Sequence, residues 1–190
     1  RVGVIWGAGI GGIQTFEEEV MNFNLENPRI SPFFIPKMIA NMASGCISIE
    51  YGFTGPNMTT VSACASSANA LADALFYIRL GKADVIVSGG SEAAITPTGV
   101  AGFNSLKALS TRNDDPKTAS RPFDKDRDGF VMGEGGAAII LEEYEHALKR
   151  GAKIYAEFVG AGLTADAYHI TAPDPEGNGA AEVMKLACED

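Results

Sequence analysis

The residue best suited to chemistry is Cys64, which lies between two segments of different character. The strand-like segment 58–63 precedes it, and segment 64–80, rich in small residues with apolar residues at helical spacing, comes directly after it. A thiol at a helix N-terminus lies at the positive end of the helix dipole, near unpaired N–H groups that favour the thiolate. The pattern therefore favours Cys64 as a nucleophile, while a small buried apolar residue remains the alternative reading.

Predicted strands and helices alternate along the chain, which indicates an α/β fold. The predicted strands are 2–6, 58–63, 84–90, about 129–132, 136–141 and 153–163. The predicted helices are 14–24, 36–50, 64–80, 97–107, 142–150 and 177–188. The polar stretch 111–127 is the one long irregular segment, and a loop of that length in a compact domain is often functional.

Composition narrows the class of protein. The chain has 190 residues, 46% of them hydrophobic and 21% charged, which fits a folded domain. No apolar run approaches the roughly 20 residues of a membrane span, and no secretory signal opens the chain, so we expect a soluble, cytoplasmic protein without membrane insertion. The net charge of −9 argues against a nucleic-acid partner. Three widely spaced cysteines, Cys46, Cys64 and Cys188, suggest reduced thiols and no metal site.

Two motifs resemble ligand-binding loops. Segment 7–12 has the glycine spacing of a dinucleotide-binding turn, but the polar, proline-broken segment 25–28 stands where that motif needs a strand ending in an acid. We therefore expect these glycines to let the backbone pass close to another part of the chain. Segment 124–129 begins like a calcium loop, yet Gly135 occupies the position that requires a bidentate Glu, so we interpret it as a turn whose charges pair locally.

Histidines are scarce. His146 lies in a segment typical of a surface helix and is expected to be structural. His169 comes after a predicted strand; it could serve as a base for Cys64, but a single histidine more often satisfies local backbone groups. Both ends of the chain interrupt a predicted element, so we expect a segment of a longer polypeptide, incomplete at both ends.

Several motifs in order give the chain a resemblance to a known family. They are Arg29–Phe34, Val61–Ser67, Gly89–Glu92, Ala108–Asn113, Arg121–Asp124, Asp128–Gly135 and Asp166–His169. Together they resemble the β-ketoacyl-acyl carrier protein synthases of the thiolase superfamily, and most of all the type II elongating synthases. The resemblance runs along the whole chain.

The resemblance implies a thiolase-like fold of two similar halves, layered α-β-α-β-α and assembled as a homodimer. Residues 1–150 would belong to the N-terminal half, and residues 151–190 would begin the C-terminal half. Cys64 would take an acyl group from acyl carrier protein, and the carbanion left by decarboxylation of malonyl-carrier protein would then attack the acyl-enzyme. No cofactor is implied beyond the phosphopantetheine arm of the carrier protein.

The resemblance also implies roles for other residues. The acyl pocket would be lined by Ile10, Phe103 and Phe34, with plain core packing as the alternative for both aromatics. Thr171 would lie beside the pantetheine arm. Arg29 and Lys107 would meet the acidic carrier protein, with ordinary surface charge as the alternative.

The remaining catalytic groups of the family, two histidines, a lysine and a glycine-rich phenylalanine gate, would come after Asp190, and neither His146 nor His169 matches them. The N–H of Cys64 would supply half of an oxyanion hole. Two alternatives stay open. One is a polyketide-type ketosynthase, and the other is a non-catalytic scaffold that holds an acyl chain or carrier protein, against which the presence of Cys64 argues.

Overall fold

The computed structural model describes residues 1–190 and contains one four-stranded sheet in the order β2-β1-β3-β4. Strands β1 (Val2–Gly7), β2 (Asn57–Thr60) and β3 (Val85–Glu92) are parallel, and β4 (Gly135–Glu142) runs antiparallel to β3. The fold is therefore α/β, as predicted, with the carboxyl ends of three parallel strands at one edge of the sheet.

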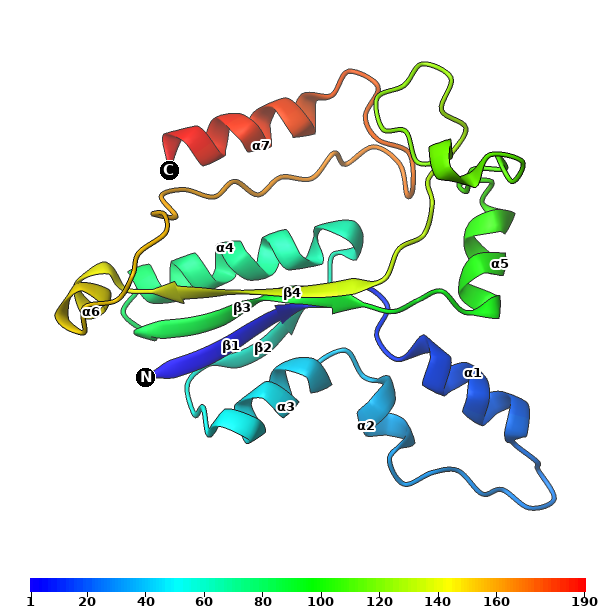
Figure 1. Ribbon diagram of the computed structural model, residues 1–190, viewed down its shortest axis with the longest axis horizontal. Helices are drawn as coiled ribbons and strands as arrows, with labels where there is room; N and C mark the ends of the chain where they lie inside the picture. Colours follow the sequence, from blue (N-terminus) through cyan, green and yellow to red (C-terminus); the bar gives the residue numbers. More distant parts are fainter.

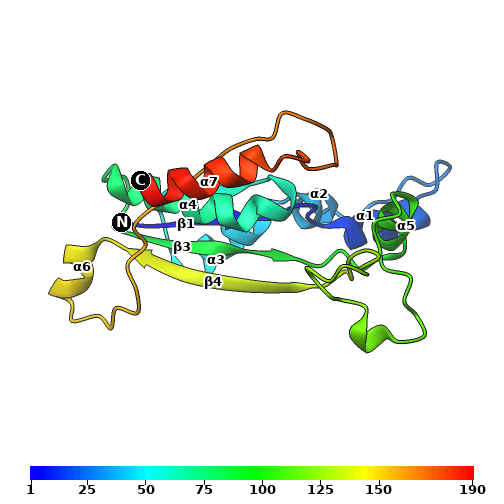
Figure 2. The ribbon, with the colours of Figure 1, turned by 90° about the horizontal axis from the view of Figure 1, so that it is seen from above.

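Helices cover both faces of this sheet (Figure 1). The helices are α1 (Ile13–Asn22), α2 (Phe34–Met38), α3 (Met42–Tyr51), α4 (Ser66–Arg79), α5 (Pro97–Ser105), α6 (Tyr144–Lys149) and α7 (Asn178–Glu189). Helix α4 lies on one face and α3 on the other, which makes three layers. Figures 1 and 2 show α1 and α5 beyond the carboxyl ends of the parallel strands and α6 at the opposite end.

The core consists of two small apolar clusters, one on each face of the sheet. Ile5 and Ile86 pack against Ala70 and Ala74 of α4. Neighbouring positions on the same strands, Val4, Trp6 and Val87, face α3 instead. This alternation results from the two-residue period of a strand, which sends successive side chains to opposite faces.

The predicted strand 153–163 is wrong, because that segment forms no strand. It runs as an extended segment between α4 and α7 (Figure 1). A Cβ at Gly162 would overlap the backbone of Val183 in α7, so the segment packs closely on a helix. A strand needs a neighbouring strand for its hydrogen bonds, and none lies beside this segment.

Three other predictions need correction. The strand near 129–132 is reduced to one isolated bridge between Leu109 and Phe130. The helix 36–50 is two helices, α2 and α3, interrupted around Ile39, whose backbone is extended at φ −72° and ψ 138°. The predicted helix 64–80 begins as a 3₁₀ turn, Ala63–Ala65, and becomes α-helical at Ser66. The longest helix, α4, has 14 residues, and none of the helices is a candidate membrane span.

Candidate active site at the carboxyl edge of the sheet

The candidate site lies where the three parallel strands end. The loop after β1 carries the glycine motif, and the turn after β2 carries Cys64. Strand β3 continues further: Gly7, the last residue of β1, pairs with Gly90, and β3 runs on to Glu92. Loops at the carboxyl ends of parallel strands are where α/β folds place their binding groups.

Cys64 lies exposed in the 3₁₀ turn that joins β2 to α4. The preceding residue, Ala63, has φ 51°, a left-handed conformation that is costly for a residue with a Cβ. Ser66 holds this turn, because its Oγ accepts from the N–H of Ser62 at 2.9 Å and donates to the carbonyl of Ala63 at 2.7 Å. The sharp turn thus presents the Cys64 thiol at the surface, directly before α4.

Glycines allow the start of α4 to lie against the strands. A Cβ at Gly7 would overlap the backbone of Ser66 and Ser67, and one at Gly90 would come within 2.7 Å of Cβ of Ser67. A Cβ at Gly9 would stand 3.4 Å from the carbonyl oxygen of Ala63. The expectation that the glycines of segment 7–12 permit close backbone approach is confirmed. Gly7 and Gly9 lie against the start of α4 and the Cys64 turn, whereas Gly11 and Gly12 lie against the backbone of Lys37 and Met38.

Sequence reasoning did not single out Glu92 as a site residue. Its carboxylate accepts hydrogen bonds from the N–H groups of Gly9 at 2.7 Å, Ile10 at 2.7 Å and Gly11 at 3.1 Å. Convergent amides of this kind form an anion-binding concavity. Here a carboxylate of the chain itself fills it, so the amides that would cradle a phosphate in a dinucleotide site are already engaged.

The three residues expected to line an acyl pocket lie on separate elements. Ile10 is 44% exposed at the tip of the glycine loop. Phe34 of α2 stacks on Phe16 with ring centroids 6.3 Å apart, and Phe103 of α5 makes an edge-to-face contact with Phe130 at 5.3 Å. A hollow of about 430 Å³ lies beside the glycine loop, but none of the three expected residues lines it; Glu92 and Glu134 do.

Arg29 and Lys107, expected to meet the carrier protein, are both exposed, and so is Thr171, expected beside the pantetheine arm. Lys107 has φ 53° just after the last turn of α5, where its N–H bonds to the carbonyl of Asn104 at 2.8 Å. Glycine or asparagine usually fills such a position. A lysine held there against its conformational preference is consistent with a functional constraint.

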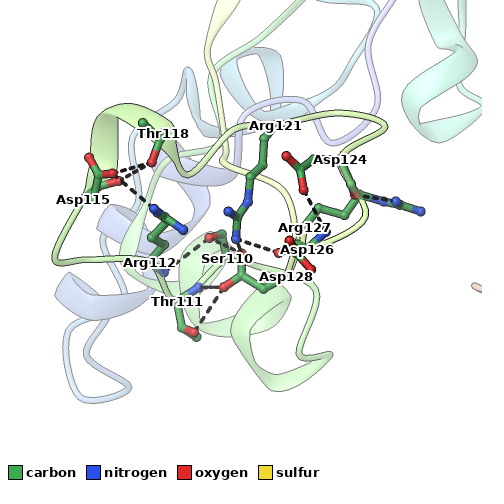
Figure 3. Close-up of polar contacts among 10 residues, drawn as sticks. All are labelled: Ser110, Thr111, Arg112, Asp115, Thr118, Arg121, Asp124, Asp126, Arg127 and Asp128. Carbon is green, nitrogen blue, oxygen red and sulfur yellow. Dashed lines mark hydrogen bonds and ion pairs between the residues drawn. The ribbon is translucent and has the colours of Figure 1, made fainter.

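The long loop after Lys107 is ordered by its own polar side chains (Figure 3). The carboxylate of Asp128 accepts from Ser110 Oγ at 2.6 Å and from the N–H of Thr111 at 2.9 Å. The hydrogen bond from Ser110 lowers the pKa of Asp128 below its usual range, and the hydrogen bond from the Thr111 amide makes the second-largest contribution. These bonds fasten the two ends of the loop together, beside the bridge between Leu109 and Phe130.

Inside this loop, segment 124–129 is a turn, as expected. The N–H of Asp126 donates to Asp124 Oδ1 at 2.7 Å, and Arg127 donates to the carbonyl of Asp124 at 2.8 Å. Arg121 crosses the loop to the carbonyl of Asp126 at 2.6 Å (Figure 3). The structure contains no group of three or more His, Cys, Asp or Glu side chains arranged to hold a metal ion.

Both histidines serve local structure. Nδ1 of His146, in α6, contacts Oε1 of Glu142, the last residue of β4, at 2.5 Å. The Nδ1 atom of His169 accepts from the N–H groups of Thr171 at 3.1 Å and Ala172 at 3.0 Å. The expectation that His169 satisfies local backbone groups is confirmed, and its ring nitrogen is engaged beside Thr171.

Comparison with known proteins shows which family the chain resembles. The family model described as beta-ketoacyl synthase, N-terminal domain, matches residues 1–147. The 3-oxoacyl-[acyl-carrier-protein] synthase 2 of Synechocystis sp. is 56% identical over the whole chain, and that of Vibrio cholerae is 51% identical. The chain spans 46% of the length of each of these two relatives.

Two solved structures resemble the whole chain. A beta-ketoacyl synthase from Burkholderia phymatum superposes with a TM-score of 0.88 at 38% identity, and the chain covers 46% of it. A type II polyketide ketosynthase, solved with its acyl-carrier protein and a bound hexaketide, has a TM-score of 0.88 at 34% identity, with 48% covered. These superpositions confirm the thiolase-like ketosynthase fold expected from the sequence, for the part of that fold that the chain covers.

Proposed function

Because the chain belongs to the beta-ketoacyl synthase family, we propose that the full-length protein elongates fatty acyl chains on acyl carrier protein, with Cys64 as the acyl-accepting nucleophile. The observation that carries this proposal is the exposed Cys64 thiol in the 3₁₀ turn after left-handed Ala63, at the carboxyl edge of the parallel strands. Relatives at 51–56% identity named 3-oxoacyl-[acyl-carrier-protein] synthase 2 support the reaction class.

The reaction proceeds in two steps. The Cys64 thiol loses its proton, and the thiolate attacks the carbonyl of an acyl thioester. A carbon–sulfur bond to Cys64 forms, the carbon–sulfur bond to pantetheine breaks, and the pantetheine thiolate leaves and takes up the proton that Cys64 lost. Malonyl-carrier protein then loses carbon dioxide, and its carbanion attacks the acyl group on Cys64. The product is a 3-oxoacyl chain longer by one two-carbon unit, and the Cys64 thiolate is released.

The roles of the other residues rest on the family resemblance. Ile10, Phe103 and Phe34 line the acyl chain, and Thr171 lies beside the pantetheine arm. Arg29 and Lys107 meet the acidic carrier protein; their exposure is what such contacts require. The proposal includes a homodimer with residues 1–150 in the N-terminal half and 151–190 opening the C-terminal half, a cytoplasmic location, and no cofactor beyond the pantetheine arm.

A polyketide-type ketosynthase is the second candidate, because the hexaketide-bound ketosynthase has the same fold over the whole chain. Both candidates use Cys64 in the same way and differ in the fate of the condensation product. The identity to that ketosynthase is 34%, against 51–56% to the fatty-acid relatives, which favours fatty-acid elongation.

Product analysis with the full-length protein tests the proposal. Supplied with acyl- and malonyl-carrier protein, it is expected to release the 3-oxoacyl product of a single condensation. Repeated condensation without reduction would favour the polyketide reading. Carrier-protein binding with no condensation and no thiol acylation would favour the scaffold reading.

A further inference from the structure

The loop that carries Ile10 is held by one side chain from a distant part of the chain. Glu92 lies 81–83 residues away in sequence from the three amides that it binds, at 2.7–3.1 Å. Both carboxylate oxygens take part, Oε2 with Gly9 and Ile10 and Oε1 with Gly11. Hydrogen bonds to a charged acceptor are stronger than neutral ones, so this contact fixes the loop firmly.

Glu92 reaches the loop because of the strand register. Strand β3 extends beyond the end of β1, where Glu92 pairs with Gly135 of β4. The preceding residue, Ser91, accepts a hydrogen bond from Trp6 Nε1 at 2.9 Å, which fixes the end of β3 against β1. The carboxylate is therefore delivered by two paired strands and not by a mobile loop.

Without Glu92 no hydrogen bond would hold the amides of residues 9–11, although Ile13 N–H donates to the carbonyl of Gly11 at 2.9 Å and two further bonds hold the flanking residues. Ala8 donates to the carbonyl of Thr60 at 3.3 Å, and Gly12 donates to that of Met38 at 2.9 Å. Between these points the amides of residues 9–11 donate to Glu92, and two of those three residues are glycine. Glycine has the widest conformational freedom of any residue, so a loop of this composition needs an external anchor to hold one side chain in place.

We propose that Glu92 is a positioning residue for acyl-chain selection: its carboxylate fixes the backbone of residues 9–11 and so sets where the Ile10 side chain stands in the acyl pocket. Glu92 acts through Ile10 and does not touch the acyl chain. This inference rests on the proposed function, in which Ile10 lines the acyl chain.

The test compares kcat/KM for hexanoyl- and myristoyl-carrier protein in the full-length protein and its Glu92→Gln variant. Glutamine keeps the size of the side chain but loses its charge and presents an NH₂ group toward an N–H donor. We expect the ratio of long-chain to short-chain kcat/KM to change by about tenfold, since a displacement of about 1 Å can change a rate by about a hundredfold. Glu134→Gln is the matched control, because Glu134 lines the same hollow but accepts from Ile95 N–H.

Ile10→Phe separates this inference from the proposed function, because it narrows the pocket without touching Glu92. A changed ratio in both Ile10→Phe and Glu92→Gln, with Glu134→Gln unchanged, supports the inference. A changed ratio in Ile10→Phe alone, or an equal loss for both chain lengths in Glu92→Gln, overturns it. An unchanged ratio in Ile10→Phe refutes the Ile10 assignment itself and the inference with it. Should Glu92→Gln not fold, Glu92→Asp is measured in its place with the same readouts.

Discussion

At the scale of single residues, exposure does not distinguish Cys64 from the other thiols. Cys46, Cys64 and Cys188 are all exposed. What sets Cys64 apart is its turn, with a left-handed Ala63 before it and Ser66 bonded back across it. Strained backbone of this kind costs free energy and persists where the surrounding structure holds it.

Lys107 offers a second test at the scale of single residues. Its positive φ lowers the stability of the fold, and a role in binding the carrier protein would explain why a lysine is kept there. Lys107→Asn should raise the free energy of unfolding by about 1 kcal/mol, since asparagine tolerates the left-handed region better than lysine. The same change should raise KM for acyl-carrier protein, because a cation is lost. Urea denaturation and steady-state kinetics on the full-length protein measure both effects.

Lys82→Asn serves as the control, since Lys82 is also exposed but does not have a positive φ. An unchanged KM for acyl-carrier protein in Lys107→Asn would show that Lys107 does not contact the carrier protein. An unchanged or lower stability would show that its backbone is not strained.

Of the two main site residues, Cys64 could be predicted from the sequence and Glu92 could not. Cys64 stands out locally, because a strand-like run and a small-residue helical run meet at it. Glu92 has no such local signal, since its three partners lie more than 80 residues away and only strand register brings them together. The glycine motif indicated a close approach but not what approaches.

At the scale of elements, the seating of α4 on the sheet determines where Cys64 lies. Gly7→Ala would force a Cβ into the backbone of Ser66 and Ser67. Overpacking of this kind costs about 1–3 kcal/mol, and here it would also displace the Cys64 turn. We expect a lower free energy of unfolding and slower alkylation of Cys64 by iodoacetamide in the full-length protein.

Gly133→Ala is the matched control, because a Cβ there meets nothing within 4 Å. Its stability and Cys64 alkylation rate should stay close to those of the parent. If Gly7→Ala and Gly133→Ala had the same free energy of unfolding and the same Cys64 alkylation rate, the result would contradict the close packing of α4 on the strands.

A pH test applies to the junction of β4 and α6. Hydrogen bonds from Arg150, at 2.8 and 2.6 Å, lower the pKa of Glu142 from its ordinary value of 4.5 to about 2. Because the folded-state pKa is below the unfolded value, the stabilisation is complete above pH 4.5 and is lost as pH falls toward 2. Glu142→Gln should therefore flatten the pH dependence of urea denaturation across that window, and an unchanged slope would count against the pairing.

Helices and strands could be predicted from the sequence where a single periodic pattern of apolar residues determines them. Strands β1 and β3 and helix α4 have long apolar patterns with one period, and the structure places them within two residues of their predicted bounds. Segment 153–163 also has an apolar pattern, but a strand depends on a partner that composition cannot reveal. The break between α2 and α3 has no proline or glycine to mark it, because residues 39–41 are Ile, Ala and Asn. The two helices pack on different partners, α2 on α1 and α3 on β1 and β2.

At the scale of the whole molecule, the core is small for the length of the chain. Only 23 of 190 residues are buried. Strand β4 exposes neighbouring residues that point to opposite faces, Ile139 at 52% and Ile140 at 56%. Large apolar side chains left exposed on both faces of one strand indicate an interaction surface or a site of aggregation.

The 190-residue chain expressed alone should therefore self-associate or bind a hydrophobic dye. Size-exclusion chromatography with light scattering and a thermal melt measure this directly. A monodisperse monomer that melts sharply without dye binding would contradict the expectation, and the full-length protein is the comparison.

The central claim is that Cys64 accepts the acyl group, and peptide mapping after incubation with acyl-carrier protein tests it most directly. The full-length protein should gain the mass of one acyl group, on the peptide that contains Cys64, while Cys46 and Cys188 serve as internal controls because they are equally free and exposed. Cys64→Ala should gain no acyl group. Equal labelling of the three thiols, or acylation that survives in Cys64→Ala, would contradict the claim.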